Sequence, residues 1–231
     1  VYKRQVLAPG KRGLGFGVGS EPLPAVFAAA GASIVATDAP VETAVREGWR
    51  DTGQFAADVE RLANPGICDA ASFGELVSYR TVDMNRIPGD LDGFDFCWSA
   101  CCFEHLGSLR HGADFVIDSV ERCLAPGGVA VHTTEFNLSS NTDTLESPAL
   151  SIYRHSDIAA LVDELERRGH RVSPFTIAPD AHVLDHFVDL PPYHGDLHLR
   201  LELEGFATTS VGLVITKSGG TSAGVRPPTG Q

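Results

Sequence analysis

One stretch near the start of the sequence, KRGLGFGVGSEPLPAVFAAAGASIVATD over residues 11–38, constrains the fold more than any other. Three glycines, Gly15, Gly17 and Gly19, alternate where a short apolar run gives way to an alanine-rich, helix-like run, and a β-branched run then ends at Asp38. Glycine allows positive φ and a close approach of backbone to ligand, and an acid that ends the second strand can accept hydrogen bonds from ribose hydroxyls. The stretch therefore predicts the nucleoside-binding half of an α/β fold. The alternative is a glycine turn that only packs tightly, with Asp38 capping the following segment.

Strand-like and helix-like segments alternate along most of the chain. Short apolar and β-branched runs predict strands over 13–18, 33–38, 77–83, 94–100, 129–135, 171–177, 197–203 and 209–216. Runs of helical period predict helices over 21–30, 41–47, 52–63, 108–124 and 158–169. This order predicts a doubly wound, mostly parallel sheet with helices on both faces. The last two strands leave no room for a crossover helix between them, so we expect an antiparallel member at that end.

Composition narrows the class of protein. The 231 residues are 43% hydrophobic, and no apolar run is long enough to span a bilayer, so no membrane partner is expected. We expect one domain over 10–217, a poorly ordered or non-native stretch over 1–9, and a disordered tail over 218–231. The net charge of −12 opposes binding to a phosphate backbone, which argues against nucleic acid as a partner. Five cysteines without CxxC spacing predict free thiols and a cytoplasmic protein.

Further motifs follow the glycine stretch in a set order. VDMN closes the third strand, FDFCWSACCFEHL covers the fourth strand and its loop, LAPGG leads into the fifth, and RHSDIAALVDELERRGHRV covers the last helix. Together with GLGFGVG and VATD, this order resembles the class I S-adenosylmethionine-dependent methyltransferases over residues 10–217. The resemblance implies a Rossmann-like, mostly parallel seven-stranded sheet with an antiparallel terminal strand. It also implies S-adenosylmethionine as cofactor.

The resemblance implies roles for the glycine stretch. Gly15, Gly17 and Gly19 would line the methionine and ribose part of the cofactor, and Asp38 would bind the ribose hydroxyls. The sequence departs from the family at Gly13, where many members have an acid. The contact near the cofactor's amino group must then come from another residue.

The resemblance also implies contacts at the ends of the third and fourth strands. Asp83 would accept a hydrogen bond from the adenine amino group, and the Met84 backbone would lie beside the ring. Ser99 and Ala100 would lie near the methyl group that is transferred.

Two candidate catalytic residues, Glu104 and His105, lie on the loop after the fourth strand. Histidine is the residue type most often used as a general base, so His105 could remove a proton from an acceptor. The alternative is that this Glu-His pair steadies the loop and the next helix. Some members of the family bind a divalent metal here, but Cys101 occupies the position of the upstream acid, so no metal site is predicted.

Two polar segments are candidates for the acceptor side of the site. Over 133–146, Glu135 and Asn137 could bind a polyhydroxylated acceptor, or could satisfy the backbone of their own turn. The segment 178–196 and its flank contain potential zinc ligands, namely His182, Asp185, His186, Asp189, His194 and His198. Their spacing matches no zinc signature, and we expect this inserted segment to be a lid over the acceptor site instead.

These observations favour an S-adenosylmethionine-dependent methyltransferase that acts on a small-molecule or glycan-like polar acceptor, at oxygen. One alternative is an NAD(P)-dependent Rossmann oxidoreductase. That class would need a proton relay such as Tyr-x-x-x-Lys, but Tyr153 is followed at that spacing by Asp157. The other alternative is a non-catalytic relative that binds a nucleoside. The sequence does not indicate an oligomeric state.

Overall fold

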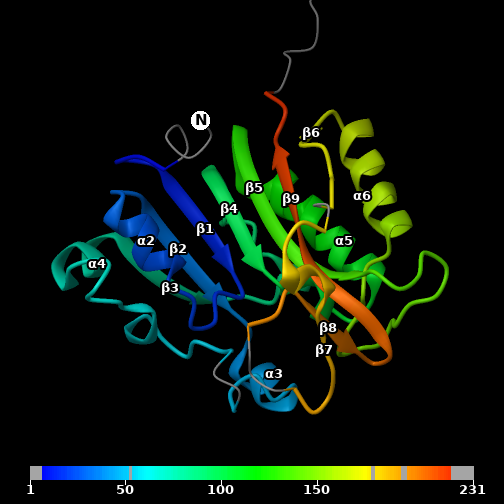
Figure 1. Ribbon diagram of the computed structural model, residues 1–231. Coiled ribbons are helices and arrows are strands. Elements are labelled where there is room, and N and C mark those ends of the chain that lie inside the picture. The colour runs from blue at the N-terminus through cyan, green and yellow to red at the C-terminus, as the bar shows by residue number, and fades with distance from the viewer. Residues whose placement is uncertain (1–6, 52–53, 178–179, 194–196, 220–231) are drawn as a thin grey trace, which may run out of the picture.

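The protein is described by a computed structural model that covers residues 7–51, 54–177, 180–193 and 197–219. Within these residues one sheet has nine strands, in the order β3-β2-β1-β4-β5-β9-β8-β7, with β6 pairing with β9 (Figure 1). The strands are β1 (Arg12–Phe16), β2 (Ser33–Asp38), β3 (Val77–Thr81), β4 (Phe94–Ala100), β5 (Leu124–Asn137), β6 (Arg171–Val172), β7 (Val188–Asp189), β8 (Arg200–Leu203) and β9 (Phe206–Thr216). The α-helices are α2 (Leu23–Ala29), α3 (Val41–Arg46), α4 (Ala70–Leu76), α5 (Leu109–Asp118) and α6 (His155–Arg167).

The pairing of the strands confirms the predicted class of fold. β1 pairs in parallel with β2 and β4, β2 with β3, and β4 with β5, whereas β9 is antiparallel to β5 and β8. The count of nine differs from the seven expected. The strand predicted over 171–177 ends at Val172, and the short strands β7 and β8 extend the sheet beyond β9.

Each face of the sheet carries its own core. Ile34, Ala36, Phe96 and Trp98 pack against α2 and α4 on one face. Leu14, Phe16 and Cys97 pack with the buried side of α5 and α6 on the other. Because neighbouring side chains alternate along a strand, β4 contributes to both cores. β1 contributes Leu14 and Phe16 to the core of α5 and α6 and has glycines on the other face. The sheet is therefore covered on both faces by helices (Figure 1).

Two glycines of β1 are required by this packing. A Cβ at Gly13 would collide with the Phe96 ring, and a Cβ at Gly15 would collide with the Trp98 ring. The sequence therefore has glycine at these positions because aromatic side chains of the neighbouring strand β4 occupy the space above them.

The helix predicted over 52–63 is wrong for the part of it that the structure describes. Only Glu60–Leu62 forms a short 3-10 turn, and residues 52–53 lie outside the described residues. The Ala56 N–H donates to the Asp38 carboxylate, and the Ala56 carbonyl accepts from the Tyr79 hydroxyl. Tertiary hydrogen bonds thus take the backbone groups that a helix would have used. The helix that does form nearby, α4, was not predicted.

Other boundaries moved by several residues. The helix expected over 108–124 is α5, which continues as a π-helical turn over Ser119–Cys123, and the strand expected over 129–135 extends from Leu124 to Asn137. All five cysteines are free thiols, as predicted. No helix of the described part of the chain has both the length and the hydropathy that a bilayer crossing requires. The predictions for residues 1–6 and 220–231, and for His194, lie outside the described residues.

Candidate functional site

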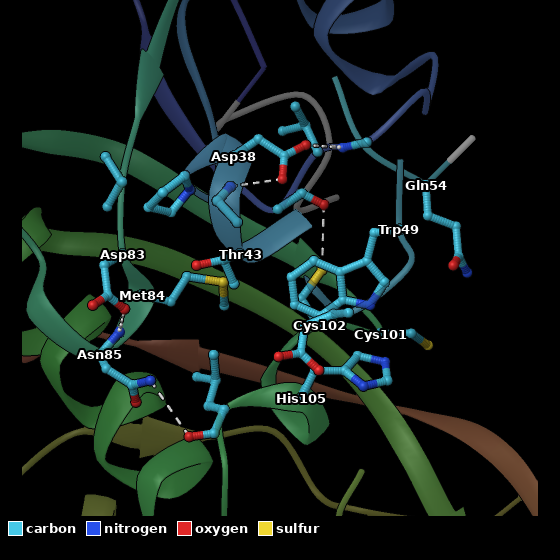
Figure 2. A pocket seen from close by; sticks show the side chains of 18 of the residues that line it. Asp38, Thr43, Trp49, Gln54, Asp83, Met84, Asn85, Cys101, Cys102 and His105 are labelled. Carbon is cyan, nitrogen blue, oxygen red and sulfur yellow. Dashed lines mark hydrogen bonds between the residues drawn. The ribbon is translucent and has the colours of Figure 1, made fainter. Parts of the chain in front are cut away.

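A pocket of about 620 Å³ lies at the carboxyl ends of β1, β2, β3 and β4. That volume is within the range of sites for small molecules and cofactors. The lining comes from the glycine turn after β1, the segment after β2 with α3, the turn after β3 and the loop after β4. Asp38, Asp83, Met84 and His105 surround this one cavity (Figure 2). In a parallel sheet with this strand order, ligands bind outside the carboxyl ends of the strands.

Gly17 and Gly19 form the turn that lines the pocket. Their φ angles are 57° and 51°, in the left-handed region that glycine adopts without strain. A Cβ at Gly17 would lie 2.7 Å from Cys102 Sγ, and one at Gly19 would lie 2.7 Å from the Gln54 carbonyl oxygen. The turn can therefore hold only glycine at both positions. Gly15, the third predicted glycine, does not line the pocket and makes room for Trp98 instead.

Asp38 ends β2 and is only 4% exposed. Its Oδ2 accepts from the backbone N–H of Gly19 and Ala56, both at 3.0 Å, and its Oδ1 accepts from Ala39 N–H at 2.7 Å. Burial raises the pKa of Asp38, and these three hydrogen bonds oppose that rise. A carboxylate has about four lone-pair sites, so roughly one remains for a ligand hydroxyl. Asp38 thus holds the glycine turn to the 54–56 segment in addition to lining the pocket.

Glu21 is a second carboxylate in the pocket, and the sequence analysis did not select it. Its side chain accepts a 2.5 Å hydrogen bond from Trp98 Nε1. Burial raises the pKa of Glu21 to about 7; the Trp98 bond lowers it, and the charge of Asp38 raises it further. The Trp98 indole reaches this position over Gly15, so the glycine places a pocket carboxylate indirectly. Glu21 is suited to supply the acidic contact that Gly13 cannot make.

Asp83 and Met84 lie at the end of β3, on the other side of the pocket. Asp83 is exposed, and its Oδ1 accepts from Asn85 N–H at 2.9 Å, which caps the short 3-10 turn Met84–Arg86. Val82 N–H donates to the Asp38 carbonyl oxygen, which fixes this turn against the end of β2. The two carboxylates predicted to bind one nucleoside therefore share one cavity, as we expected from the order of the strands.

The two residues at the end of β4 have different environments. Ala100 lines the pocket, as predicted for a residue near the reacting group. Ser99 does not: it is 2% exposed, and its hydroxyl lies 2.8 Å from His132 Nδ1. His132 also lies 3.0 Å from the Ser119 hydroxyl, and burial lowers its pKa to about 3. Ser99 thus belongs to a neutral, buried hydrogen-bond chain because its side chain points into the core beside α5 instead of into the pocket.

His105 lies in the pocket, within the 3-10 turn Phe103–His105. Its Nδ1 is 2.7 Å from the Ala149 carbonyl oxygen, and its ring meets the Trp49 ring edge to face with centroids 5.7 Å apart. A carbonyl only accepts hydrogen bonds, so Nδ1 must carry the proton, which leaves Nε2 as the proton acceptor of the neutral ring. The orientation of His105 is thus suited to removing a proton.

Several predicted residues are not at the pocket. Glu104 is fully buried and accepts from the Thr134 hydroxyl at 3.1 Å, so it cannot contact a pocket ligand from this position. Asn137 binds the backbone and side chains of residues 139–144, which is the structural alternative. The described residues of 178–196 do not line the pocket either. Among its candidate zinc ligands, His182 caps a turn and His198 pairs with Asp189 at 3.2 Å.

The pocket also contains residues that sequence reasoning missed, notably Glu21, Arg46, Trp49 and Cys102. Glu21 follows Gly19 by two positions, and this closeness to the glycine turn could have identified it as a pocket residue. Arg46 ends α3, within the helix predicted over 41–47, and Trp49 lies just beyond that prediction. Nothing local in the sequence indicates that α3 lies across the ends of the strands, as it does in Figure 1.

Comparison with known proteins gives the fold a family context. No protein-family model matches the sequence, and no curated protein matches it. Similar solved structures include a Bacillus halodurans protein that carries a methyltransferase assignment, with 12% identity, a TM-score of 0.57, and 93% of this chain and 96% of that chain covered. An S-adenosylmethionine-dependent methyltransferase of Methanosarcina mazei has 13% identity and a TM-score of 0.56, with 94% and 97% covered. DhpI, solved as a complex with SAH, has 13% identity and a TM-score of 0.52, with 94% and 80% covered.

At these identities the likeness concerns the fold. The chain has the Rossmann-like fold of the S-adenosylmethionine-dependent methyltransferases, as the order of its motifs implied.

Proposed function

We propose that this chain is an S-adenosylmethionine-dependent methyltransferase that acts on a small, hydroxylated acceptor, such as a sugar-containing molecule, at oxygen. One observation carries the proposal most directly. The glycine turn, Asp38 and Asp83 border a single cavity at the carboxyl ends of β1, β2 and β3. This is the place where a fold of this type binds a nucleoside.

The residues of the pocket fit this cofactor. Gly17 and Gly19 give it a side-chain-free wall, Asp38 retains about one lone-pair site for a ribose hydroxyl, and exposed Asp83 with Met84 can meet the base. Glu21 would face the amino group of the methionine part, since a half-buried carboxylate there lacks a cationic partner in the described contacts. When bound, the cofactor supplies an activated methyl group. A solved neighbour complexed with SAH supports the choice of cofactor.

The chain's own residues would orient the acceptor and remove its proton. His105 presents Nε2 as a base because Nδ1 is held by the Ala149 carbonyl. Trp49, beside His105, offers a flat apolar ring on which an acceptor can pack, and the 146–149 turn that holds His105 closes the same side. A base beside an aromatic surface supports a hydroxyl acceptor with an apolar face. Such a base contributes about 10²–10⁴-fold to the rate of a reaction.

Calorimetry tests the cofactor. We expect S-adenosylmethionine and its demethylated product SAH to bind with one-to-one stoichiometry, and NAD not to bind. Asp83→Ala should weaken SAH binding while leaving the fold intact, because Asp83 is exposed. Binding of NAD in place of SAH would favour the oxidoreductase.

Turnover with a labelled methyl donor and a panel of hydroxylated small molecules tests the reaction. His105→Asn keeps a donor for the Ala149 carbonyl but removes Nε2. We expect turnover to fall about 100-fold with SAH affinity unchanged. A wild-type protein that binds SAH but labels no molecule of a cell extract would instead indicate the non-catalytic relative.

A further inference from the structure

A second polar cluster lies beside the pocket, toward β5. Cys101 follows β4, Glu104 lies in the next 3-10 turn, and Glu135 lies in β5. The thiol sulfur and one oxygen of each carboxylate all lie within 4.8 Å of one another. The cluster thus joins three potential metal ligands that are 34 positions apart at their extremes.

In each carboxylate of this cluster, one oxygen accepts a hydrogen bond from a hydroxyl group and the other oxygen does not. The Thr134 hydroxyl donates to Glu104 Oε2 at 3.1 Å, and the Ser210 hydroxyl donates to Glu135 Oε1 at 3.2 Å. Glu104 Oε1 and Glu135 Oε2 are buried and accept no hydrogen bond from any residue that the structure describes. Glu104 as a whole is 0% exposed. The two hydroxyls fix the orientation of both side chains and leave two buried acceptor oxygens unsatisfied.

Such an arrangement is unfavourable by itself. A buried carboxylate oxygen without a donor loses its hydration without compensation, and two neighbouring carboxylates repel each other when both are ionised. A bound cation removes both costs at once, because it takes a lone pair from each oxygen and neutralises their charge.

We propose that Cys101, Glu104 and Glu135 form a binding site for one divalent transition-metal ion of the zinc class. A thiolate with two carboxylates is a ligand set that zinc accepts, whereas magnesium and calcium prefer oxygen ligands alone. Bond lengths of about 2.0–2.3 Å place zinc ligands roughly 3.5 Å apart, so small side-chain rotations would close the site. No metal site was predicted from the sequence, because position 101 is not an acid and nothing local in the sequence pairs this loop with β5.

The site would keep one open position. Three protein ligands and one exchangeable ligand are typical of catalytic zinc. Cys101 also lines the pocket, so the open position is accessible from the cavity that holds His105. An acceptor hydroxyl bound there would lose its proton more readily. This role rests on the proposed methyltransferase function, whereas metal binding itself does not.

Titration of the purified protein, freed of metal with a chelator, tests the site. We expect Zn²⁺ to bind tightly at one site, and Co²⁺ to bind there with a thiolate-to-cobalt charge-transfer absorption band. Cys101→Ser should abolish the band, and Glu135→Gln should weaken Zn²⁺ binding by roughly 100-fold while the Co²⁺ band persists at higher cobalt. Cys102→Ser is the matched control, because the Cys102 thiol contacts the carbonyl oxygens of Gly17 and Ala100 instead. It should bind both metals like the wild type.

The readouts separate this inference from the proposed function. The absence of a charge-transfer band in the wild type, or an equal band in Cys101→Ser, would overturn the metal site. SAH binding to the metal-free protein in that case would leave the methyltransferase proposal standing. Metal binding without any binding of S-adenosylmethionine or SAH would support the metal site and overturn the methyltransferase proposal. Circular dichroism and thermal unfolding of each variant show whether a loss of metal binding reflects a loss of fold.

Discussion

Two groups of acidic side chains lie at the carboxyl ends of the strands, and they differ in how their oxygens are satisfied. Asp38 and Glu21, at the ends of β2 and β1, accept from three backbone N–H groups and one indole N–H. Glu104 and Glu135, near β4 and β5, each hold one hydroxyl donor and retain one buried oxygen without a partner.

This difference separates carboxylates that stabilise the fold from carboxylates that can bind a ligand. A satisfied carboxylate joins the segments whose N–H groups it binds, so its removal should unfold or loosen them. An unsatisfied carboxylate contributes little to the framework and has a lone pair for a ligand. Asp38 should therefore respond to mutation mainly in stability, whereas Glu104 and Glu135 should respond mainly in ligand binding.

The largest expected effect is at Asp38. Asp38→Ala leaves the N–H groups of Gly19, Ala39 and Ala56 without their acceptor, which should lower the free energy of unfolding by about 3 kcal/mol or more. Denaturant unfolding of the protein without ligand measures this. Asp83→Ala, which removes an exposed carboxylate from the same pocket, is the control and should lower stability by only about 1 kcal/mol, because Asp83 caps a single turn. Equal stability of the two variants would show that Asp38 is not part of the framework.

The next effect is at Gly15. Gly15→Ala forces the Trp98 ring away, and overpacking of this kind costs about 1–3 kcal/mol. Since Trp98 holds Glu21, SAH affinity should fall as well. The control is Gly74→Ala in α4, where an added Cβ meets no atom within 4 Å and should stabilise the helix by about 0.5–1 kcal/mol. Normal SAH affinity in Gly15→Ala would show that Gly15 does not position Glu21 through the Trp98 indole.

An effect of opposite sign is expected at Glu104. In the metal-free protein, Glu104→Gln replaces a buried carboxylate with a neutral amide that still accepts from Thr134. Burial raises the pKa of Glu104 to about 8, so at neutral pH the folded state must retain a proton that the unfolded state loses. The amide removes this cost, and unfolding should become harder by up to about 1 kcal/mol. Asp38→Asn should do the reverse, since an amide nitrogen cannot accept from an N–H. A clear loss of stability in Glu104→Gln would place Glu104 with the framework group.

The smallest effect concerns pH and Glu21. Burial raises the pKa of Glu21 to about 7, so the carboxylate forms only as pH rises through that value, where the cofactor's α-amino group is still protonated. SAH affinity should therefore be a few-fold lower near pH 6 than above pH 7. Glu21→Gln should remove the fall in SAH affinity on the acidic side of the pH profile.

The same group affects the stability of the protein without ligand. Because the folded pKa of Glu21 lies above its ordinary 4.5, the folded state retains the proton longer, and this contribution to stability falls as pH rises from about 4.5 to 7. If SAH affinity still falls at acidic pH in Glu21→Gln, the fall is caused by the titration of another group.

Much of the fold and part of the site could be predicted from local patterns. Alternating apolar runs identified the parallel strands, and Asp38 and Asp83 were expected to meet because the carboxyl ends of parallel strands lie at one edge. The helix over 52–63 failed because the backbone of Ala56 is used by Asp38 and Tyr79, which are 18 and 23 positions away. The spacing of apolar residues along the chain carries no information about contacts between such distant residues.

Sequence periodicity and turn chemistry alone determined the class of fold, the glycine turn and the shared nucleoside edge, since each depends on neighbours along the chain. Only the tertiary structure decided which oxygen each donor satisfies. Trp98 reaches Glu21 over Gly15, and Glu104 in its 3-10 turn meets Glu135 of β5, because register and packing bring together groups that are remote in sequence. Hydrogen bonds in a dry interior depend on positions within a few tenths of an ångström, and those positions are set by the whole fold.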